Sequence, residues 1–314
     1  MSLKNRRGQR GVTALVAAAI ITAAMLVLVS AMALQVRSLD MSERYAIPWE
    51  QGVEAIDLNV AAALGEVDVS FADLQGDAAV ITTRLSGSAS MLGGENLLSM
   101  NVTYEHDRGT GVLNVTAIMD VYAPWPYHSL DQVRCDVVID RRLAAGINIT
   151  VTTGGATVRT AEGTNITGIN IDTTSLGSAI VLNNGTVLSG DVRMRTATGG
   201  GTLYWNNVVV DGDRTLSMEE SSGQLRTVIV QDGGMGGTVT LLKKSVGGPI
   251  ALDMELSGDV SGTVGASRDD ARFNCSEGFR CHDGAMTSIR PAESSFDVRM
   301  ESAGGIEARG RWTP

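Results

Sequence analysis

Hydrophobic and polar residues alternate along most of this chain. From Val53 onward, apolar residues recur at every second position in short runs, and one of the longest goes from Leu113 to Val121. Alternate side chains of a strand point to opposite faces, so each run predicts a short strand with one buried face. No stretch after residue 52 has the 3.6-residue period of an amphipathic helix. The pattern therefore predicts an all-β domain over residues 53–314.

Pairs of glycines separate many of these runs. Gly-Gly stands before an alternating run at 154–155, 199–200, 236–237, 247–248 and 304–305. Glycine permits positive φ and a close approach of two backbones, which tight corners need. Short strands joined at such corners predict a β-solenoid, a short-rung β-helix that buries aliphatic ladders and needs few aromatic residues. Aromatic residues make up 4% of the chain, which fits this architecture. A β-sandwich with fewer and longer strands is the competing one.

The first 34 residues have a different character. Val12 to Leu34 is apolar except for three hydroxyl residues, and the four bases before it are accompanied by no acid. A helix of this length would extend about 34 Å, enough to cross a hydrocarbon core of about 30 Å. The positive-inside rule would leave its N-terminus in the cytoplasm. We therefore predict a protein of the cell membrane with an extracellular C-terminal domain. Its four segments are a cytoplasmic basic tail (1–11), a transmembrane helix or signal anchor (12–34), a juxtamembrane connector with a helix that breaks at Pro48 (35–52) and the extracellular domain (53–314).

Two other fates of the N-terminal segment remain open. Ala31-Met32-Ala33 fits the small-x-small rule for cleavage of a secretory signal, which would release a chain beginning at Leu34. Alternatively, Arg10-Gly11 before the apolar run resembles the leader of archaeal type IV pilin precursors, which are cut after such a glycine. The cut would fall between Gly11 and Val12, and the mature helix would then pack into a filament. Bacterial pilins usually carry Glu at the fifth residue after the cut, where this chain has Val16.

Charge and glycosylation signals agree with an exterior location. The formal net charge is −10, and without the first 34 residues the remainder holds 21 bases and all 35 acids, a net charge of −14. This balance argues against nucleic acid as a partner. Six Asn-x-Ser/Thr sequons predict N-glycosylation, unless these residues simply occupy β-turns and strand edges. The sequons start at Asn101, Asn114, Asn148, Asn165, Asn184 and Asn274.

The three cysteines divide into a pair and a single residue. Cys275 and Cys281 are close together in NCSEGFRCHDG, and outside the cytosol this spacing predicts a disulfide. A metal site formed with His282 is the alternative, but a fourth ligand is not evident nearby. Cys135 lies in the alternating run Val133 to Ile139, so we predict a buried, inert thiol.

Signatures of catalysis are missing from the sequence. It contains no HExxH, G-x-S-x-G or phosphate-loop motif, and its histidines are scattered. We therefore predict no enzymatic activity and no cofactor. Asp211 and Asp213 flank a glycine in a turn that is a candidate for Ca²⁺, although two solvated acids are the simpler interpretation. The same holds for Glu219-Glu220 and Asp269-Asp270.

Two aromatic segments are candidates for contact surfaces. Pro124-Trp125-Pro126-Tyr127 interrupts the strand pattern, and it predicts either a cap on the stack or a loop that contacts a partner. Tyr204 and Trp205 are neighbours in a strand, so their side chains point to opposite faces and one of them is expected to be exposed.

The region from Val53 to Trp312 resembles the adhesin domain family of bacteria and archaea. The similar stretches are GVEAIDLNVAAALGEVDVSF near the start, TATGGGTLYW in the middle and FDVRMESAGGIEARGRW at the end. The resemblance is a pattern of short strands and glycines over most of the domain. It implies a β-solenoid behind a single membrane helix, with a role in adhesion or in sensing envelope stress. It implies no catalytic residues.

Together these features predict a non-catalytic, cell-surface structural or adhesive protein. Its partners would be the membrane, through the N-terminal helix, and surfaces, envelope polymers or other proteins, with self-assembly as a further possibility. The alternatives are a pilin-like filament subunit and an envelope-stress sensor that acts through a membrane partner, since a tail of about ten residues is too short to signal. The remaining alternative is an enzyme that acts on polysaccharide, because β-helices can also carry such activities.

Overall fold

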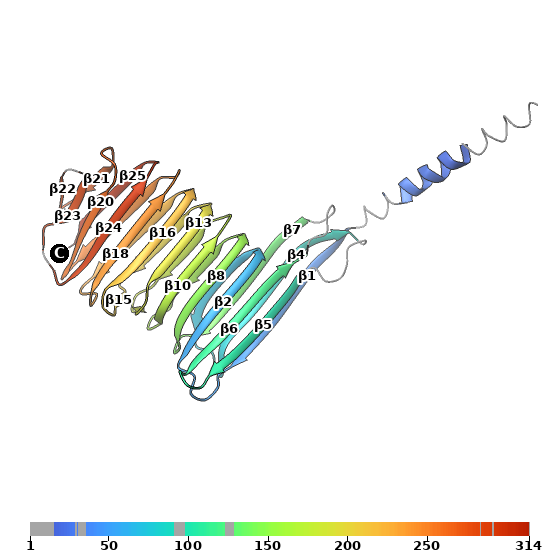
Figure 1. Cartoon of the computed structure of the whole chain (residues 1–314), viewed down its shortest axis with the longest axis horizontal. Coiled ribbons are helices and arrows are strands. Elements are labelled where there is room, and N and C mark those ends of the chain that lie inside the picture. Colours follow the sequence, from blue (N-terminus) through green and yellow to red (C-terminus); the bar gives the residue numbers. More distant parts are fainter. Residues whose placement is uncertain are drawn as a thin grey trace, which may run out of the picture.

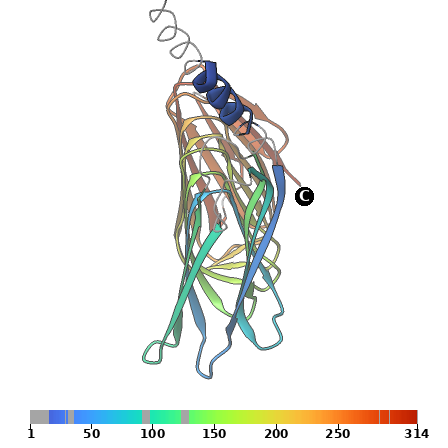
Figure 2. The same cartoon turned by 90° about the vertical axis from the view of Figure 1, so that its right-hand side faces the viewer.

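The computed structural model describes residues 16–28, 30, 36–90, 98–122, 129–282, 284–290 and 292–313. Strands dominate this part of the chain and form two large sheets (Figure 1). Seen from the end with the longest strands, the sheets are two facing walls (Figure 2). The prediction of an all-β chain is therefore confirmed.

Sheet A contains eleven of the described strands. In spatial order they are β1 (Val36–Pro48), β4 (Asp77–Ser90), β7 (Ser129–Asp140), β3 (Glu66–Ala72), β9 (Ala156–Arg159), β11 (Ser178–Leu182), β14 (Gly201–Asn206), β17 (Leu225–Asp232), β19 (Ile250–Ser257), β25 (Ile306–Trp312) and β21 (Arg272–Cys275).

Sheet B contains the other fourteen. In spatial order they are β22 (Phe279–His282), β23 (Ala285–Ser288), β20 (Val260–Ala266), β24 (Ser294–Ser302), β18 (Thr238–Ser245), β16 (Arg214–Ser222), β13 (Val192–Thr198), β10 (Asn165–Thr173), β8 (Ala144–Thr153), β2 (Ala55–Leu64), β6 (Val112–Val121) and β5 (Leu98–Asp107). The short strands β12 (Val187–Leu188) and β15 (Val209–Val210) pair with each other, and β12 also pairs with β10.

The middle of the molecule is a parallel stack. From β8 to β19 the longer strands alternate between sheet B and sheet A, so each passage around the stack adds one of them to each sheet. Corresponding residues are in register: Ile147 lies beside Ile169 in sheet B, and Ile180 beside Leu203 in sheet A. Register of this kind aligns the inward side chains in columns, which is what the alternating runs require if every run is to bury one face.

Antiparallel pairing marks both ends of the stack. At the N-terminal end β4 pairs in this way with β1 and β7, and β5 with β6. At the C-terminal end β23 pairs antiparallel with β20 and β22. The expected helix in the connector is wrong, because residues 36–48 form β1. The alternation of Leu39, Met41 and Tyr45 turns these side chains toward the core, whereas Asp40, Ser42 and Arg44 are exposed.

Glycine allows the corners of successive turns to touch. At Gly248 an added Cβ would overlap the carbonyl group of Gly223 in the turn before, and at Gly304 it would lie 2.5 Å from the carbonyl oxygen of Gly248. Any side chain at such a position would force the backbones of adjacent turns apart. The glycine pairs are therefore corner residues, as the sequence predicts.

The N-terminal apolar segment is helical over residues 16–28 and at residue 30. No helix in the described part of the chain has both the length and the apolar character needed to cross a membrane. The other residues of the predicted span, together with the predicted cleavage positions Gly11 and Val12, lie outside the described residues.

Candidate functional site

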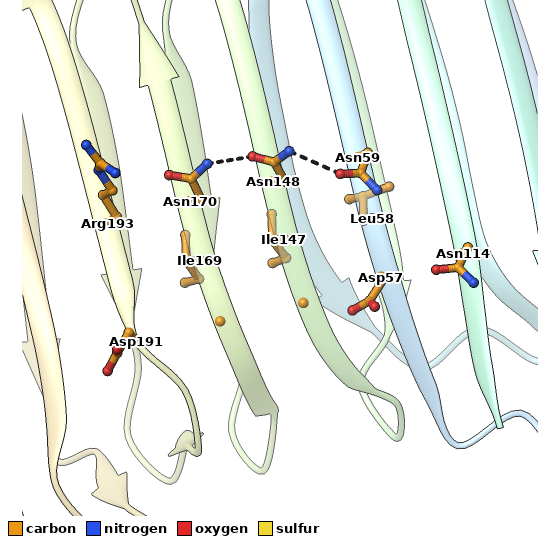
Figure 3. A pocket seen from close by; sticks show the side chains of 12 residues that line it. Asp57, Leu58, Asn59, Asn114, Ile147, Asn148, Ile169, Asn170, Asp191 and Arg193 are labelled. Carbon is orange, nitrogen blue, oxygen red and sulfur yellow. Dashed lines mark hydrogen bonds between the residues drawn. The ribbon is translucent and has the colours of Figure 1, made fainter. Parts of the chain in front are cut away.

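A shallow hollow of about 590 Å³ lies on the outer face of sheet B (Figure 3). It crosses β6, β2, β8, β10 and the start of β13. Its floor is the backbone at Gly146 and Gly168, which are in register on the adjacent strands β8 and β10. The carboxylate of Asp57 leans over Gly146, whereas the space above Gly168 is open. The polar side chains around this floor are those of Asp57, Asn59, Asn114, Asn148, Asn170, Asp191 and Arg193. We call this region the amide hollow.

One side of the amide hollow is a ladder of asparagines. Asn59, Asn148 and Asn170 occupy matching positions on β2, β8 and β10. Nδ2 of Asn148 donates to Oδ1 of Asn59 at 3.1 Å, and Nδ2 of Asn170 donates to Oδ1 of Asn148 at 2.7 Å (Figure 3). Arg193 on β13 is next in register and continues the row. Each amide nitrogen of the two donors keeps a second N–H for a ligand.

A second row runs parallel to the ladder along the floor. Asn114, Asp57, Gly146 and Gly168 are consecutive in register, and Asp191 follows just before β13. Within the described residues, the side chains of Asp57 and Asn114 make no hydrogen bond or ion pair. Oδ1 of Asp191 accepts a hydrogen bond from the backbone N–H of Thr215 at 2.9 Å. The row therefore places the unengaged carboxylate of Asp57 at one side of the glycine floor and the partly engaged carboxylate of Asp191 at the other.

Strand alternation explains why these side chains face outward. Ile56, Leu58 and Val60 of β2 are buried, so Asp57 and Asn59 between them are exposed. The same alternation on β8 buries Ile147 and exposes Asn148. The hollow can hold a ligand by hydrogen bonds from side chains. The single cation in it, Arg193, is 3.8 Å from the carboxylate of Glu219.

Two further hollows on the outer faces contain mainly paired charges. On sheet A a hollow of about 400 Å³ lies over β17, β19 and β25, where Arg309 binds Glu307 at 2.8 Å and Arg311 binds Glu255. On sheet B a hollow of about 520 Å³ lies over β16, β18 and β24, where Lys244 and Glu301 are 3.6 Å apart. Because neighbouring charges already neutralise each other, these hollows offer a ligand fewer unengaged groups than the amide hollow.

The predicted sequons are spread over both sheets and their corners. Asn165 is half-buried and accepts a hydrogen bond from the hydroxyl of Ser189 at 3.1 Å. The other five are exposed: Asn101, Asn114, Asn148, Asn184 and Asn274. Two of these, Asn114 and Asn148, lie in the amide hollow itself. Glycosylation at the six sites stays a prediction.

The predicted disulfide and the predicted burial of Cys135 are confirmed. Cys275 and Cys281 form a disulfide near the C-terminal end of the stack, so they are not available with His282 as ligands of a metal. Cys135 is fully buried between β4 and β3. Burial, with the nearby carboxylates of Asp136 and Asp68 adding to it, raises the pKa of this thiol to about 12. A thiol in that environment is not a nucleophile near neutral pH.

The acid pairs lie in different surroundings. Asp211 and Asp213 are exposed, and Oδ1 of Asp213 accepts the N–H of Thr238 at 2.9 Å, which fixes the turn. The side chain of Glu219 lies on the outer face of sheet B, whereas that of Glu220 is buried in the core. Asp270 is exposed and binds Arg268. Among the described residues, no group of three or more His, Cys, Asp or Glu side chains is placed to hold a metal ion.

The aromatic predictions have different outcomes. Trp205 is buried at 1% exposure and Tyr204 is 40% exposed, as expected for neighbours in a strand. The segment Pro124-Trp125-Pro126-Tyr127 and His128 lie outside the described residues. His106 is beside Glu50 at 3.2 Å, near the tip of the N-terminal end.

Sequence reasoning missed the amide hollow, although one signal was available. Gly-Ile-Asn-Ile occurs at 146–149 and again at 168–171. Two identical tetrapeptides one turn apart put glycine beside glycine and asparagine beside asparagine. The sequons at Asn114 and Asn148 predict glycosylation instead, and no local pattern distinguishes Asp57 or Asp191.

Comparison with known proteins gives only weak likenesses. No protein-family model matches the chain, and no curated protein matches it. A candidate cell adhesion protein from Clostridium sporogenes is similar at 12% identity and a TM-score of 0.43, over 87% of this chain and 100% of that one. A candidate adhesin from Bacteroides fragilis is similar at 8% identity and a TM-score of 0.39, over 86% and 97% of the two chains. Likenesses of this strength carry no argument about function.

Proposed function

We propose that this chain is a non-catalytic adhesive protein displayed at the cell surface, and that its two-sheet stack is a short-rung β-solenoid. Sheet alternation from β8 to β19 and in-register columns support the solenoid. The amide hollow supports an adhesive role more than any other feature. It is open and crosses five strands, and it offers hydrogen-bonding side chains on a face that a large partner can reach.

The proposed location rests on the two ends of the chain. The basic tail and the apolar segment 12–34 favour a membrane anchor with the stack outside. The disulfide between Cys275 and Cys281 favours an oxidising compartment. In that compartment the exposed sequons outside the amide hollow, at Asn101, Asn184 and Asn274, would be accessible for N-glycosylation.

Surface display tests the adhesive role. The full chain is produced in a non-adherent host, and external protease treatment verifies its exposure. Retention of the cells is then measured on surfaces coated with polysaccharide, with protein or with neither. We expect retention above that of cells carrying an empty vector on at least one coating. Equal retention on all of them, with the chain verified outside, would contradict the proposal.

Mass spectrometry of the mature N-terminus tests the anchor. A chain that still begins near Met1 supports an anchored adhesive protein. A chain beginning at Val12 would instead support the pilin-like alternative, and filaments should then be visible by electron microscopy. A start at Leu34 would mean that the protein is released.

A further inference from the structure

We infer that the amide hollow binds a neutral polysaccharide, with the polymer lying along the axis of the stack across β2, β8, β10 and β13. This inference rests on the proposed adhesive function and names the class of partner for the same site. Four properties of the hollow support it: its place inside a sheet, its mixture of donors and acceptors, its charge and its repeat.

The place of the hollow excludes strand addition by a peptide. β2, β8 and β10 each have a hydrogen-bonded neighbour on both sides. Their backbone N–H and C=O groups are therefore engaged within the sheet, whereas a peptide that adds a strand needs an open edge. Only side chains are available to a partner at this place.

The donors and acceptors of these side chains complement hydroxyl groups. An asparagine amide both donates and accepts, and a carboxylate only accepts. In the ladder, Asn148 and Asn170 each use one amide hydrogen, and within the described residues Asp57 uses none of its oxygens. A hydroxyl group can donate to the carboxylates and accept from the amides, so a partner rich in hydroxyls satisfies both rows at once.

The charge of the site favours a neutral polymer. Asp57 and Asp191 stand at two sides of the glycine floor, and the chain without its first 34 residues has a net charge of −14. An anionic polymer would be repelled by this field. Arg193 stands at the end of the ladder but lies beside Glu219. A neutral polymer meets no like-charge repulsion at any of these groups.

The repeat of the site favours a polymer over a single sugar. Both rows run across the strands, and the ladder repeats its asparagine at the strand spacing of about 4.8 Å. From Asp57 on β2 to Asp191 at the start of β13 there are three such spacings, about 14 Å. A chain of pyranose units, each about as long as one spacing, presents hydroxyls repeatedly along this line, whereas one sugar fills only part of it.

Affinity electrophoresis of the purified full chain in detergent tests the inference. The gels contain dextran, yeast mannan or hydroxyethyl cellulose as neutral probes, polygalacturonate as the acidic probe, or no polymer. We expect at least one neutral polymer to retard the chain and polygalacturonate to have no effect. The corresponding free monosaccharide should compete at least about tenfold less effectively by mass, because it occupies only part of the rows. Retardation should persist in 0.5 M NaCl, since neutral hydrogen-bonding groups are not screened by salt.

Gly168→Val fills the floor of the hollow without disturbing the fold. A Cβ at Gly168 would meet only the carbonyl oxygen of Asp191, at an ordinary 3.6 Å, and valine favours strands. We expect about tenfold weaker retardation with an unchanged unfolding midpoint. Gly265→Val is the matched control, because Gly265 also lies on the outer face of sheet B and has open space above it. It should bind like the wild type.

Asp57→Ala is the second variant. It removes an exposed carboxylate without a described side-chain partner, so it should fold normally and bind several-fold more weakly. The inference is overturned if no neutral polymer retards the chain, if only polygalacturonate does, or if retardation is equal in wild type, Gly168→Val and Asp57→Ala. Adhesion of displaying cells to a protein coating, with no polysaccharide binding, would overturn this inference and leave the adhesive function standing.

Discussion

The core at the N-terminal end and the core of the parallel stack differ in their polar content. In the described part of the first, residues 47–151, the buried polar side chains are Thr83 and Asp140. The second, residues 156–308, buries fourteen: Thr160, Thr164, Thr173, Ser178, Thr186, Thr196, Glu220, Thr227, Gln231, Lys243, Ser245, Ser257, Ser294 and Ser302. The two cores form one continuous cluster of buried side chains. The difference in polar content therefore comes from the way the chain turns in each region.

In the stack, polar side chains inside the core hold the corners. The hydroxyls of Thr173 and Ser178 are 2.9 Å apart across one corner. Ser245 donates to the carbonyl oxygen of Gly248 at 2.9 Å and accepts its N–H at the same distance. The chain changes sheet after only a few residues, so the backbone groups of each corner face inward and need partners there.

At the N-terminal end the long hairpins turn beyond the core. Asp140 is one of the two polar side chains buried in the described part of this region, and its charge has hydrogen-bond partners of its own. Its buried carboxylate accepts hydrogen bonds from the Arg142 guanidinium and the Leu74 backbone N–H. Burial alone would raise the pKa of Asp140, but the hydrogen bonds from Arg142 and Leu74 outweigh it and hold the pKa below its usual value. The comparison shows that short turns fill the stack with polar groups, whereas long strands permit an almost purely apolar core.

The corner at Gly248 should be the position most sensitive to substitution. In Gly248→Val the new side chain would overlap the Gly223 backbone in the turn before, so we expect a loss of about 4 kcal/mol or more in the free energy of unfolding. Urea unfolding measures it. Gly305→Val, where an added Cβ meets nothing within 4 Å, is the control and should lose under about 1 kcal/mol. Equal losses in the two variants would refute the contact between turns.

Gln231 tests whether a polar side chain in the stack is essential. Its Oε1 accepts from Nε1 of Trp205 at 2.7 Å and from the N–H of Val208 at 3.1 Å. Gln231→Leu leaves both donors buried without a partner, so we expect a loss of about 3 kcal/mol in the free energy of unfolding. Gln231→Met, which keeps the length of the side chain but offers no carbonyl oxygen, shows how much of the loss is changed packing. A loss below about 0.5 kcal/mol in Gln231→Leu would show that the interaction is dispensable.

Lys243 is a polar residue that the stack tolerates at a cost. It is 1% exposed, lies in register between Met218 and Met300, and donates to the carbonyl oxygen of Ala251 at 2.7 Å. Burial lowers the pKa of Lys243 to about 7, although the carboxylate of Asp253 acts in the opposite direction.

The unfolded chain keeps the Lys243 proton up to a pKa of about 10.4, so it binds more protons than the folded chain between that pH and about 7. The free energy of unfolding of the wild type should therefore rise between pH 7 and pH 10. This gain is absent below pH 7. Lys243→Met removes this contribution and extends the methionine column. We expect it to be more stable than the wild type at pH 6, and this advantage should fall by roughly 2–3 kcal/mol by pH 9, since each pH unit above about 7 adds about 1.4 kcal/mol to the wild type. A constant difference across this range of pH would contradict the assignment.

Replacing Thr83 by valine should change the free energy of unfolding in the opposite direction to the same replacement of a threonine in the stack. It is fully buried in the N-terminal core, and its Oγ1 has no described hydrogen-bond partner. Thr83→Val keeps the shape and removes the unsatisfied group, so we expect a gain of about 1 kcal/mol. Thr173→Val in the stack breaks a buried hydrogen bond and should lose about 1 kcal/mol. Thermal unfolding of the two variants gives the sign directly, and the same sign in both would remove the distinction between the cores.

Much of the fold could be predicted from local pattern. Period-two runs identify the strands and the glycine pairs identify the corners, because both depend on residues that are close in sequence. The expected helix in residues 35–52 is wrong because the inward positions of this segment follow the period of two of a strand, and the charged Glu43 at one of them hides that period. Polar residues at inward positions, such as Gln231 and Lys243, could not be predicted, since their partners are in other turns.

By itself, the sequence determined the all-β character, the corner glycines, the disulfide between Cys275 and Cys281 and the buried thiol of Cys135. Each follows from spacing within a few residues. Only the tertiary structure decided the register that places Asn59, 89 residues away in the chain, beside Asn148. It also decided that Gly146 and Gly168 would share one floor. The amide hollow is a property of neighbouring strands, and sequence patterns within one strand do not record which strand will be its neighbour.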